Sequence, residues 1–169
     1  RANKSVDRMI NIVDDLEVIS RLETEQSVLD IQSFNIVLLV KDVFDALEMK
    51  ASQMNILLEI ANEAHTDFVM GDRDKIQQVF MNLISNSIKY GKDGGTTKVS
   101  FFDMERNMLI EVADDGIGID SGSLDRLFER FYRVDKNRSR EIGGTGLGLA
   151  IVKHILEGHN QQINVRSTI

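Results

Sequence analysis

The decisive stretch reads Gly143-Gly144-Thr145-Gly146-Leu147-Gly148-Leu149-Ala150-Ile151-Val152, with four glycines within six residues directly before an apolar run. Glycine lets the backbone approach a ligand closely and adopt a positive φ. A helix that begins there presents unpaired N–H groups and the positive end of its dipole to whatever lies in front. That arrangement suits an anion, most often a phosphate. The stretch therefore predicts a phosphate-binding turn and a helix over about 145–157, with Gly158 as its C-cap.

The composition limits the class of protein. With 169 residues, 42% of them hydrophobic, the chain can bury one sizeable core. It has no cysteine, which excludes disulfides and thiolate metal sites. No apolar run approaches the ~20 residues that span a bilayer. The net charge of −7 argues against nucleic-acid binding, so an anionic ligand would need locally concentrated positive charge or a metal.

The hydrophobic patterning predicts an α/β fold, a two-layer sandwich of one mixed β-sheet and one helical layer. Asn35 and Asp72 are expected N-caps of two long helices, the second reaching about Tyr90. Strands are expected over 56–60, 68–70, 98–103, 108–113 and 163–166. The stretch 116–144 is long and polar, with a short helical piece near 124–128, and we interpret it as a lid.

An amphipathic helix is predicted near the N-terminus, over about 6–19. Its apolar positions recur at spacings of three and four: Val6, Met9, Ile10, Val13, Leu16 and Ile19. Such a helix packs on its own domain or on a second copy of the chain. Because no partner helix follows directly, we favour an arm of a helical dimer.

Three polar side chains share one face of the helix expected after Asp72. Asn82, Asn86 and Lys89 fall within roughly 60° of arc. The opposite stripe is apolar and expected to be buried: Ile76, Val79, Phe80, Leu83 and Ile84. Asparagine competes for backbone hydrogen bonds in a helix, so two on one turn favour a function over a merely solvated face. An Asn amide oxygen suits Mg²⁺, and the Lys89 ammonium can neutralise phosphate oxygens.

A second segment, Asp114-Asp115-Gly116-Ile117-Gly118-Ile119, follows a predicted strand. A carboxylate at a strand end can accept a hydrogen bond from an exocyclic amine such as that of adenine. The glycines allow a ring to approach closely. Taken alone, the segment is more typical of a plain acidic β-turn than of a binding site.

A third segment, Leu127-Phe128-Glu129-Arg130-Phe131-Tyr132-Arg133, carries aromatic residues that could anchor the lid. From Arg126 to Arg140 the chain has six basic residues against two acidic ones. The fork of an arginine suits phosphate oxygens. We favour that role for Arg130 and Arg133, which stand beside the aromatics, whereas Lys136 and Arg138 read as solvated loop residues.

In this order the segments resemble the ATP-binding catalytic domain of bacterial sensor histidine kinases, within the gyrase, Hsp90, histidine kinase and MutL ATPase superfamily. Residues 82–90 are similar to the asparagine box, 114–119 to the first glycine box, 128–133 to the phenylalanine box and 144–149 to the second glycine box. The resemblance runs from about Phe34 to the C-terminus. It implies a Bergerat-type ATP-binding fold over 28–169.

The N-terminal residues 1–27 resemble another part of the same kinases. With the ending Ile19-Ser20-Arg21-Leu22-Glu23, they are similar to the second helix of the dimerisation and histidine phosphotransfer hairpin. That hairpin is incomplete here, because its first helix with the phosphoacceptor histidine is missing. None of His65, His154 and His159 matches the acceptor motif.

The resemblance implies ATP and Mg²⁺ as cofactors and a role for each matching residue. Asn86 would ligate Mg²⁺, and Asn82, which stands where hydrolysing relatives carry a glutamate base, would position metal, water or the acceptor. The phosphates would meet Lys89 and Arg133, with Arg130 as a further candidate. Tyr90 and Asp114 would stack on adenine and bond its amine, in a pocket with Gly116, Gly118 and Ile119. The phosphate end would comprise Gly144, Thr145, Gly146, Leu147 and Gly148, and 116–143 would form the ATP lid.

Two further features depart from the family pattern. Asp115 stands where the family usually has Asn, a surface-turn change that we expect to be harmless. The chain stops at Ile169, so the closing strand of the family is expected to be absent.

The implied reaction is transfer of the ATP γ-phosphoryl group to a histidine and then to an aspartate of a response-regulator receiver domain. Such a reaction needs positioning and charge neutralisation more than covalent chemistry by the protein. The parent would be a homodimeric inner-membrane sensor with this domain on the cytoplasmic side. The present chain would be a soluble cytoplasmic fragment that binds Mg-ATP without labelling itself.

Three rival hypotheses remain. A hydrolysing ATPase of the same superfamily is disfavoured by Asn82 in place of glutamate. An anti-sigma-type serine kinase is disfavoured by the N-terminal helix, which looks like half of a hairpin. A nucleotide-free binding module would keep the fold and lack the ligand.

Overall fold

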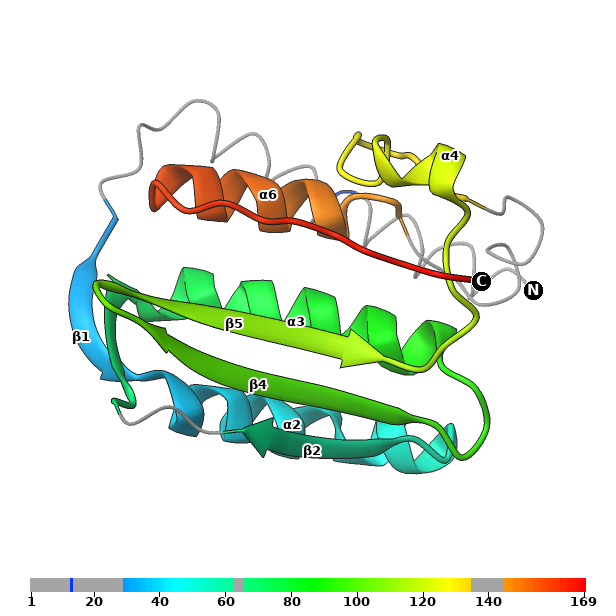
Figure 1. Cartoon of the computed structure of the whole chain (residues 1–169), viewed down its shortest axis with the longest axis horizontal. Helices are drawn as coiled ribbons and strands as arrows, with labels where there is room; N and C mark the ends of the chain where they lie inside the picture. The colour runs from blue at the N-terminus through cyan, green and yellow to red at the C-terminus, as the bar shows by residue number, and fades with distance from the viewer. Residues whose placement is uncertain (1–12, 14–28, 63–65, 135–144) are drawn as a thin grey trace. The chain divides into compact units, whose positions relative to one another are not determined.

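The computed structural model describes residues 13, 29–62, 66–134 and 145–169, which fall into two compact units (Figure 1). One unit spans Asp30–Gly118, and the other contains Leu29 and the described residues from Ile119 onward. The predicted N-terminal helix lies outside the described residues except for Val13, so its proposed role as a hairpin arm stays a prediction.

The unit 30–118 alternates strands and helices in the order given by its local patterns. Its elements are β1 (Ile31–Asn35), α2 (Ile36–Gln53), β2 (Leu57–Asn62), β3 (Phe68–Asp72), α3 (Arg73–Tyr90), β4 (Thr96–Met104) and β5 (Asn107–Asp114). The described part of the other unit holds α4 (Ser121–Leu124) and α6 (Gly148–Gly158).

A mixed three-stranded sheet orders the strands β2-β4-β5. β2 runs parallel to β4, and β4 pairs antiparallel with β5 from Thr97↔Asp114 to Met104↔Asn107. The sequence predicts that all strands belong to one sheet. That prediction is wrong for β1 and β3, which form a separate antiparallel pair. Each of these two strands leads directly into a helix.

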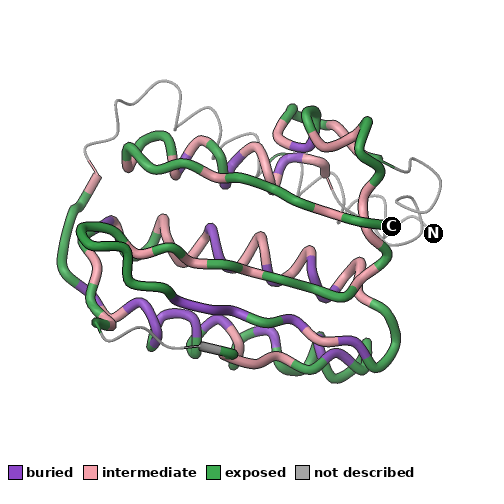
Figure 2. Tube along the Cα trace, in the orientation of Figure 1, coloured by how far each residue is buried: buried purple, intermediate pink, exposed green. Residues whose placement is uncertain are grey.

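The helices α2 and α3 pack side by side on one face of the three-stranded sheet (Figure 1). Figure 2 shows buried residues along α2, α3 and β4, the elements that contribute to the core. The core includes Ile36, Val40, Val43 and Leu47 of α2, Phe80, Ile84 and Ile88 of α3, and Val99 and Phe101 of β4. The predicted two-layer α/β arrangement is confirmed, although Ile76 and Leu83 of the expected buried stripe are only half-buried.

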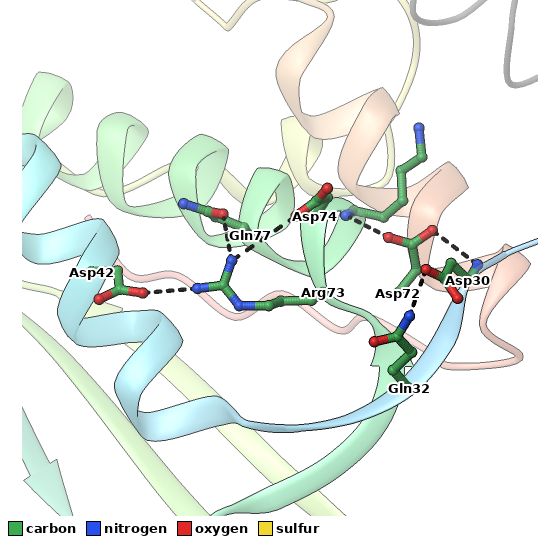
Figure 3. Close-up of polar contacts among 8 residues, drawn as sticks. Asp30, Gln32, Asp42, Asp72, Arg73, Asp74 and Gln77 are labelled. Carbon is green, nitrogen blue, oxygen red and sulfur yellow. Dashed lines mark hydrogen bonds and ion pairs between the residues drawn. The ribbon is translucent and has the colours of Figure 1, made fainter.

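Both predicted N-caps are confirmed. The Asn35 side chain accepts from the Leu38 N–H at 2.8 Å, and Asp72 accepts from the Lys75 N–H at 3.1 Å. Figure 3 shows that the second Asp72 oxygen accepts from the Asp30 N–H at 3.3 Å. These bonds fix where each long helix starts, and so fix the phase of its faces relative to the sheet.

An ion pair joins the start of α3 to α2. Arg73 Nη2 lies 2.9 Å from Asp42 Oδ2 (Figure 3), with both side chains about half exposed. Solvent screens such a pair, so it contributes only about 0–1 kcal/mol to stability. The two helices are therefore held mainly by their buried apolar contacts.

Three elements in the described part of the other unit differ from the sequence prediction. The helix α6 begins at Gly148 rather than near Thr145, and His159 rather than Gly158 is its C-cap. The short helix α4 covers 121–124 rather than 124–128. Residues 161–169 contain no strand, so the strand expected over 163–166 is wrong for this structure.

None of the helices in the described ranges combines the length and apolar character needed to cross a membrane.

Candidate nucleotide-binding site

The C-terminal half of α3 carries the four polar residues singled out in the sequence. Asn82, Asn86, Lys89 and Tyr90 are half-buried. The opposite side of the helix is buried in the core through Phe80, Ile84 and Ile88. Lys89 Nζ lies 5.1 Å from the centroid of the Tyr90 ring, within range of a cation–π contact. The helix thus presents amide, ammonium and aromatic groups from one scaffold.

Asp114 is the last residue of β5, and it pairs with Thr97 at the end of the β4–β5 ladder. Its Oδ1 atom accepts a hydrogen bond from the Gly116 N–H at 2.9 Å, which closes the turn after the strand. The residue as a whole is exposed. An exposed carboxylate held by its own turn can receive a second donor, such as an exocyclic amine.

The turn after β5 contacts the end of α3. The Ile117 N–H donates to the Tyr90 carbonyl at 3.2 Å. A Cβ added at Gly116 would lie 2.7 Å from the Tyr90 carbonyl oxygen and 2.6 Å from Asp114 Oδ1, so only glycine fits there. Gly118 has a φ of +73°, a conformation that favours glycine. The structure therefore brings the Tyr90 backbone, Gly116 and the Asp114 carboxylate into one turn, and their shared role in binding adenine stays a prediction.

In the other unit, the phenylalanine box contacts the second glycine box. The Phe131 N–H donates to the Gly146 carbonyl at 2.9 Å. Gly146 has a φ of +77°, and a Cβ added to it would lie 2.9 Å from the Phe131 carbonyl carbon. A residue with this φ cannot continue an α-helix, which explains why α6 begins two residues later than Gly146.

The N-terminus of α6 has no side-chain cap from its N-cap residue. Its N-cap residue, Leu147, is fully buried and makes no side-chain capping bond. The Leu147 N–H itself donates to Thr145 Oγ1 at 3.3 Å. The first-turn N–H groups from Gly148 onward therefore have no side-chain cap from Leu147 and suit an anion.

The segment between α4 and the glycine box is held differently from the prediction. Leu127 is its buried residue, whereas Phe131 is 53% exposed and is held through its backbone. Arg126 stacks over the Tyr132 ring at 4.3 Å, and Tyr132 donates to Ser123 Oγ at 3.1 Å. Of the three aromatics in this segment, Phe128 and Tyr132 are half-buried, and Tyr132 holds the segment through its hydroxyl and its ring.

Arg126 also forms a bidentate ion pair with Glu129, at 2.9 Å for the closest atoms. This hydrogen bond raises the pKa of Arg126 and lowers the pKa of Glu129. The Arg126 guanidinium is thus bound to Glu129 and Tyr132 of its own segment. Arg130 is exposed and Arg133 half-buried, and both remain the arginines proposed for phosphate contact.

Two predicted features cannot be placed. Gly144 and the basic stretch 135–143 of the proposed lid lie outside the described residues. Sequence reasoning also missed one contact, between Asp115 and the start of β4, because nothing in the local pattern indicates a partner 19 positions away.

Replacement of Gly146 by Ala is expected to lower affinity for Mg-ADP about tenfold or more. The added Cβ would meet the backbone of Phe131 and would strain a residue at φ +77°, a cost of about 1–3 kcal/mol. Gly158→Ala is the matched control, since its Cβ would meet nothing closer than 3.9 Å. Isothermal titration of both variants checks the result, and equal affinities would contradict it.

Comparisons with known proteins identify the family to which the chain belongs. Residues 71–169 match the family described as histidine kinase-, DNA gyrase B-, and HSP90-like ATPase. The sensor protein kinase WalK of Staphylococcus haemolyticus is 41% identical over 166 residues, which cover 95% of this chain and 26% of that protein. WalK of Staphylococcus aureus strain Newman is 37% identical over 164 residues, with the same coverage of 95% and 26%. The chain therefore spans about a quarter of the length of these curated relatives.

Solved structures of histidine kinases share the fold. AdeS of Acinetobacter baumannii has a TM-score of 0.74 and 29% identity, and the match covers 92% of this chain and 70% of that chain. A nucleotide-free catalytic domain of ThkA has a TM-score of 0.65 and 30% identity, covering 77% and 83%. ThkA in complex with the response regulator protein TrrA has a TM-score of 0.67 and 25% identity, covering 83% and 41%.

The order of the four motifs, their local geometry and these matches lead to one conclusion. The chain belongs to the histidine kinase-, DNA gyrase B- and HSP90-like ATPase family, and it is an ATP-binding catalytic domain of the sensor histidine kinase type.

Proposed function

We propose that this chain binds ATP with Mg²⁺ and donates the γ-phosphoryl group to a histidine, for relay to an aspartate of a response-regulator receiver domain. The observation that carries the proposal is the contact between the end of α3 and the turn after β5, which joins Tyr90 to Gly116 and Asp114. This contact brings the backbone of an aromatic residue next to a close-approach glycine, whose N–H is bonded to a carboxylate. Those are the groups that adenine recognition requires.

These groups would bind the adenine base of the nucleotide. The exposed Asp114 carboxylate accepts a hydrogen bond from the exocyclic amine, while the Tyr90 ring stacks on the base. Gly116 and Gly118 keep side chains out of the pocket, and Ile119 adds an apolar contact. Selectivity for the base would depend on the direction of this hydrogen bond, since a carboxylate accepts and cannot donate.

The metal and the phosphates would be held by different residues. The half-buried Asn86 offers a hard, neutral amide oxygen, and no three His, Cys, Asp or Glu residues gather into a metal site in the described part of the chain. Such a donor set fits Mg²⁺, which keeps few protein ligands beside phosphates and waters. When bound, Mg²⁺ would supply neutralisation of charge on the phosphate oxygens.

We assign the phosphates to basic side chains and to the glycine turn before α6. Lys89 and Arg133, with Arg130 as a further candidate, neutralise phosphate oxygens. Backbone N–H groups at Gly148 and the open turn over Thr145–Leu147 donate to them. The proposed contribution of Gly144 comes from the family motif alone.

Asn82 favours phosphotransfer over hydrolysis. Where a hydrolysing relative would activate water with a carboxylate, Asn82 offers only an amide, which positions a group without taking its proton. A histidine nitrogen can attack with its lone pair and needs no such base. The acceptor would be supplied by the first helix of the hairpin, since none of His65, His154 and His159 matches the acceptor motif.

The same resemblance extends the proposal to the parent protein. We infer a homodimer built through the hairpin of which residues 1–27 are one helix, in a membrane sensor with this domain on the cytoplasmic side. The receiver-domain partner is supported by the solved complex of ThkA with TrrA.

Incubation of the chain with γ-labelled ATP and Mg²⁺ separates the alternatives. We expect one-to-one binding by isothermal titration and no acid-labile phosphate on the chain itself. Stable labelling of the chain would contradict the assignment of the acceptor to another segment. Sustained phosphate release would favour the hydrolysing ATPase, and absence of binding would favour a nucleotide-free module.

A further inference from the structure

Two neighbouring carboxylates after β5 have different partners. Asp114 Oδ1 accepts from the Gly116 N–H at 2.9 Å, within its own turn. Asp115 Oδ1 accepts from the Thr96 N–H at 2.9 Å, across to the first residue of β4. The first bond closes the turn, and the second attaches the turn to a strand of the sheet.

The Asp115 carboxylate lies against the backbone of Gly95 and Thr96, which is itself held by hydrogen bonds. A Cβ added at Gly95 would lie 2.5 Å from Asp115 Oδ1, so the approach depends on a glycine at that position. Gly95 is buried, its N–H donates to the Lys92 carbonyl at 2.9 Å, and its carbonyl accepts from the Leu57 N–H at 2.9 Å. The backbone that Asp115 binds is therefore held by β2 and by the preceding turn.

The attachment lies where the ladder stops. Thr97↔Asp114 is the terminal pair between β4 and β5, so backbone pairing ends at the residue proposed to bind adenine. The bond from Asp115 to Thr96 continues the attachment one residue further along both segments. It limits the rotation of the Asp114 backbone, and with it the direction of the Asp114 side chain.

We propose that Asp115 is a positioning residue that aims the Asp114 carboxylate at the exocyclic amine of the adenine base. This inference rests on the proposed function, in which Asp114 binds that amine. The requirement is for a hydrogen-bond acceptor, because the donor is a neutral backbone N–H. An Asn at position 115 offers the same oxygen, which is the physical reason to expect that the exchange between Asp and Asn is harmless.

The test compares Asp115→Ala with Asp115→Asn, using isothermal titration of Mg-ADP and of Mg-IDP, which lacks the exocyclic amine. The readout is the ratio of the two affinities. Both nucleotides bind the same folded molecules, so a merely structural loss of folded protein does not move this ratio. We expect Asp115→Ala to reduce the preference for ADP about tenfold and Asp115→Asn to keep it within about twofold.

Gly95→Ala provides an independent variant, because it displaces the carboxylate and leaves it present. We expect the same reduced preference, and melting curves verify that each variant is folded. If Asp115→Ala and Gly95→Ala both retain the wild-type preference, the positioning role is wrong. If the unmodified chain itself shows no preference for ADP, the proposed function of Asp114 fails instead, so the two failures are distinguishable.

Discussion

Replacement of Asp114 by Asn is expected to reduce the affinity for Mg-ADP at least about 100-fold, below detection in a standard titration. The carboxylate accepts from the adenine amine, whereas the amide can turn an N–H donor toward that amine. Loss of a hydrogen bond to a charged group, together with an unpaired polar atom in the site, costs about 3 kcal/mol or more. No other single substitution is expected to affect binding as strongly.

The fold should survive this change. An Asn side chain at position 114 still offers an oxygen to the Gly116 N–H, which Asp114 Oδ1 now accepts at 2.9 Å. Asp115→Asn is the matched control, because it makes the same chemical change one residue away and is expected to bind normally. A tenfold or smaller loss for Asp114→Asn, with an unchanged melting temperature, would show that Asp114 does not contact the base.

Replacement of Asn86 by Ala is expected to remove the contribution of Mg²⁺ to nucleotide binding. In the unmodified chain, added Mg²⁺ should raise the affinity for ATP, because Asn86 would complete the coordination of a phosphate-bound ion. The variant should bind ATP equally with and without Mg²⁺. Phosphotransfer to an acceptor supplied by the parent protein should fall by about 10³-fold or more, since metal and phosphates lose their alignment.

The measurement is a pair of ATP titrations, one with excess Mg²⁺ and one with a chelator. Stability is not expected to fall, because Ala is a better helix former than Asn inside α3. Ser85→Ala is the control, a half-buried neighbour on the same helix whose hydroxyl faces Lys50 at 3.5 Å. If Asn86→Ala keeps the full effect of Mg²⁺, another residue ligates the metal.

Local physical rules were enough to predict much of the fold. The caps at Asn35 and Asp72 depend on bonds that span only three residues, so the sequence places both helix starts correctly. The hairpin of β4 and β5 follows from alternation and a short turn. These features depend on contacts between residues close in the chain, and a short window of the sequence is enough to predict such contacts.

Predictions that depend on distant partners were less accurate. The start of α6 was placed too early, since the φ of +77° at Gly146 accompanies packing against the backbone of Phe131. The predicted number of sheets, one, differs from the two observed, because strand pairing depends on which backbone edges meet in space. The stripe on α3 was predicted as buried throughout, yet Ile76 and Leu83 are partly exposed, which depends on what covers each turn of the helix.

The sequence by itself determined the class of this protein, since the order and spacing of four motifs, with the residues at each, identify the ATP-binding kinase family. It also determined which side chains share a helix face, because helical geometry alone sets that phase. Only the tertiary structure decided that the turn after β5 rests on the Tyr90 carbonyl and that Asp115 binds the backbone of β4. Such contacts join residues far apart in the chain, and their formation depends on the packing of the whole sheet against α3.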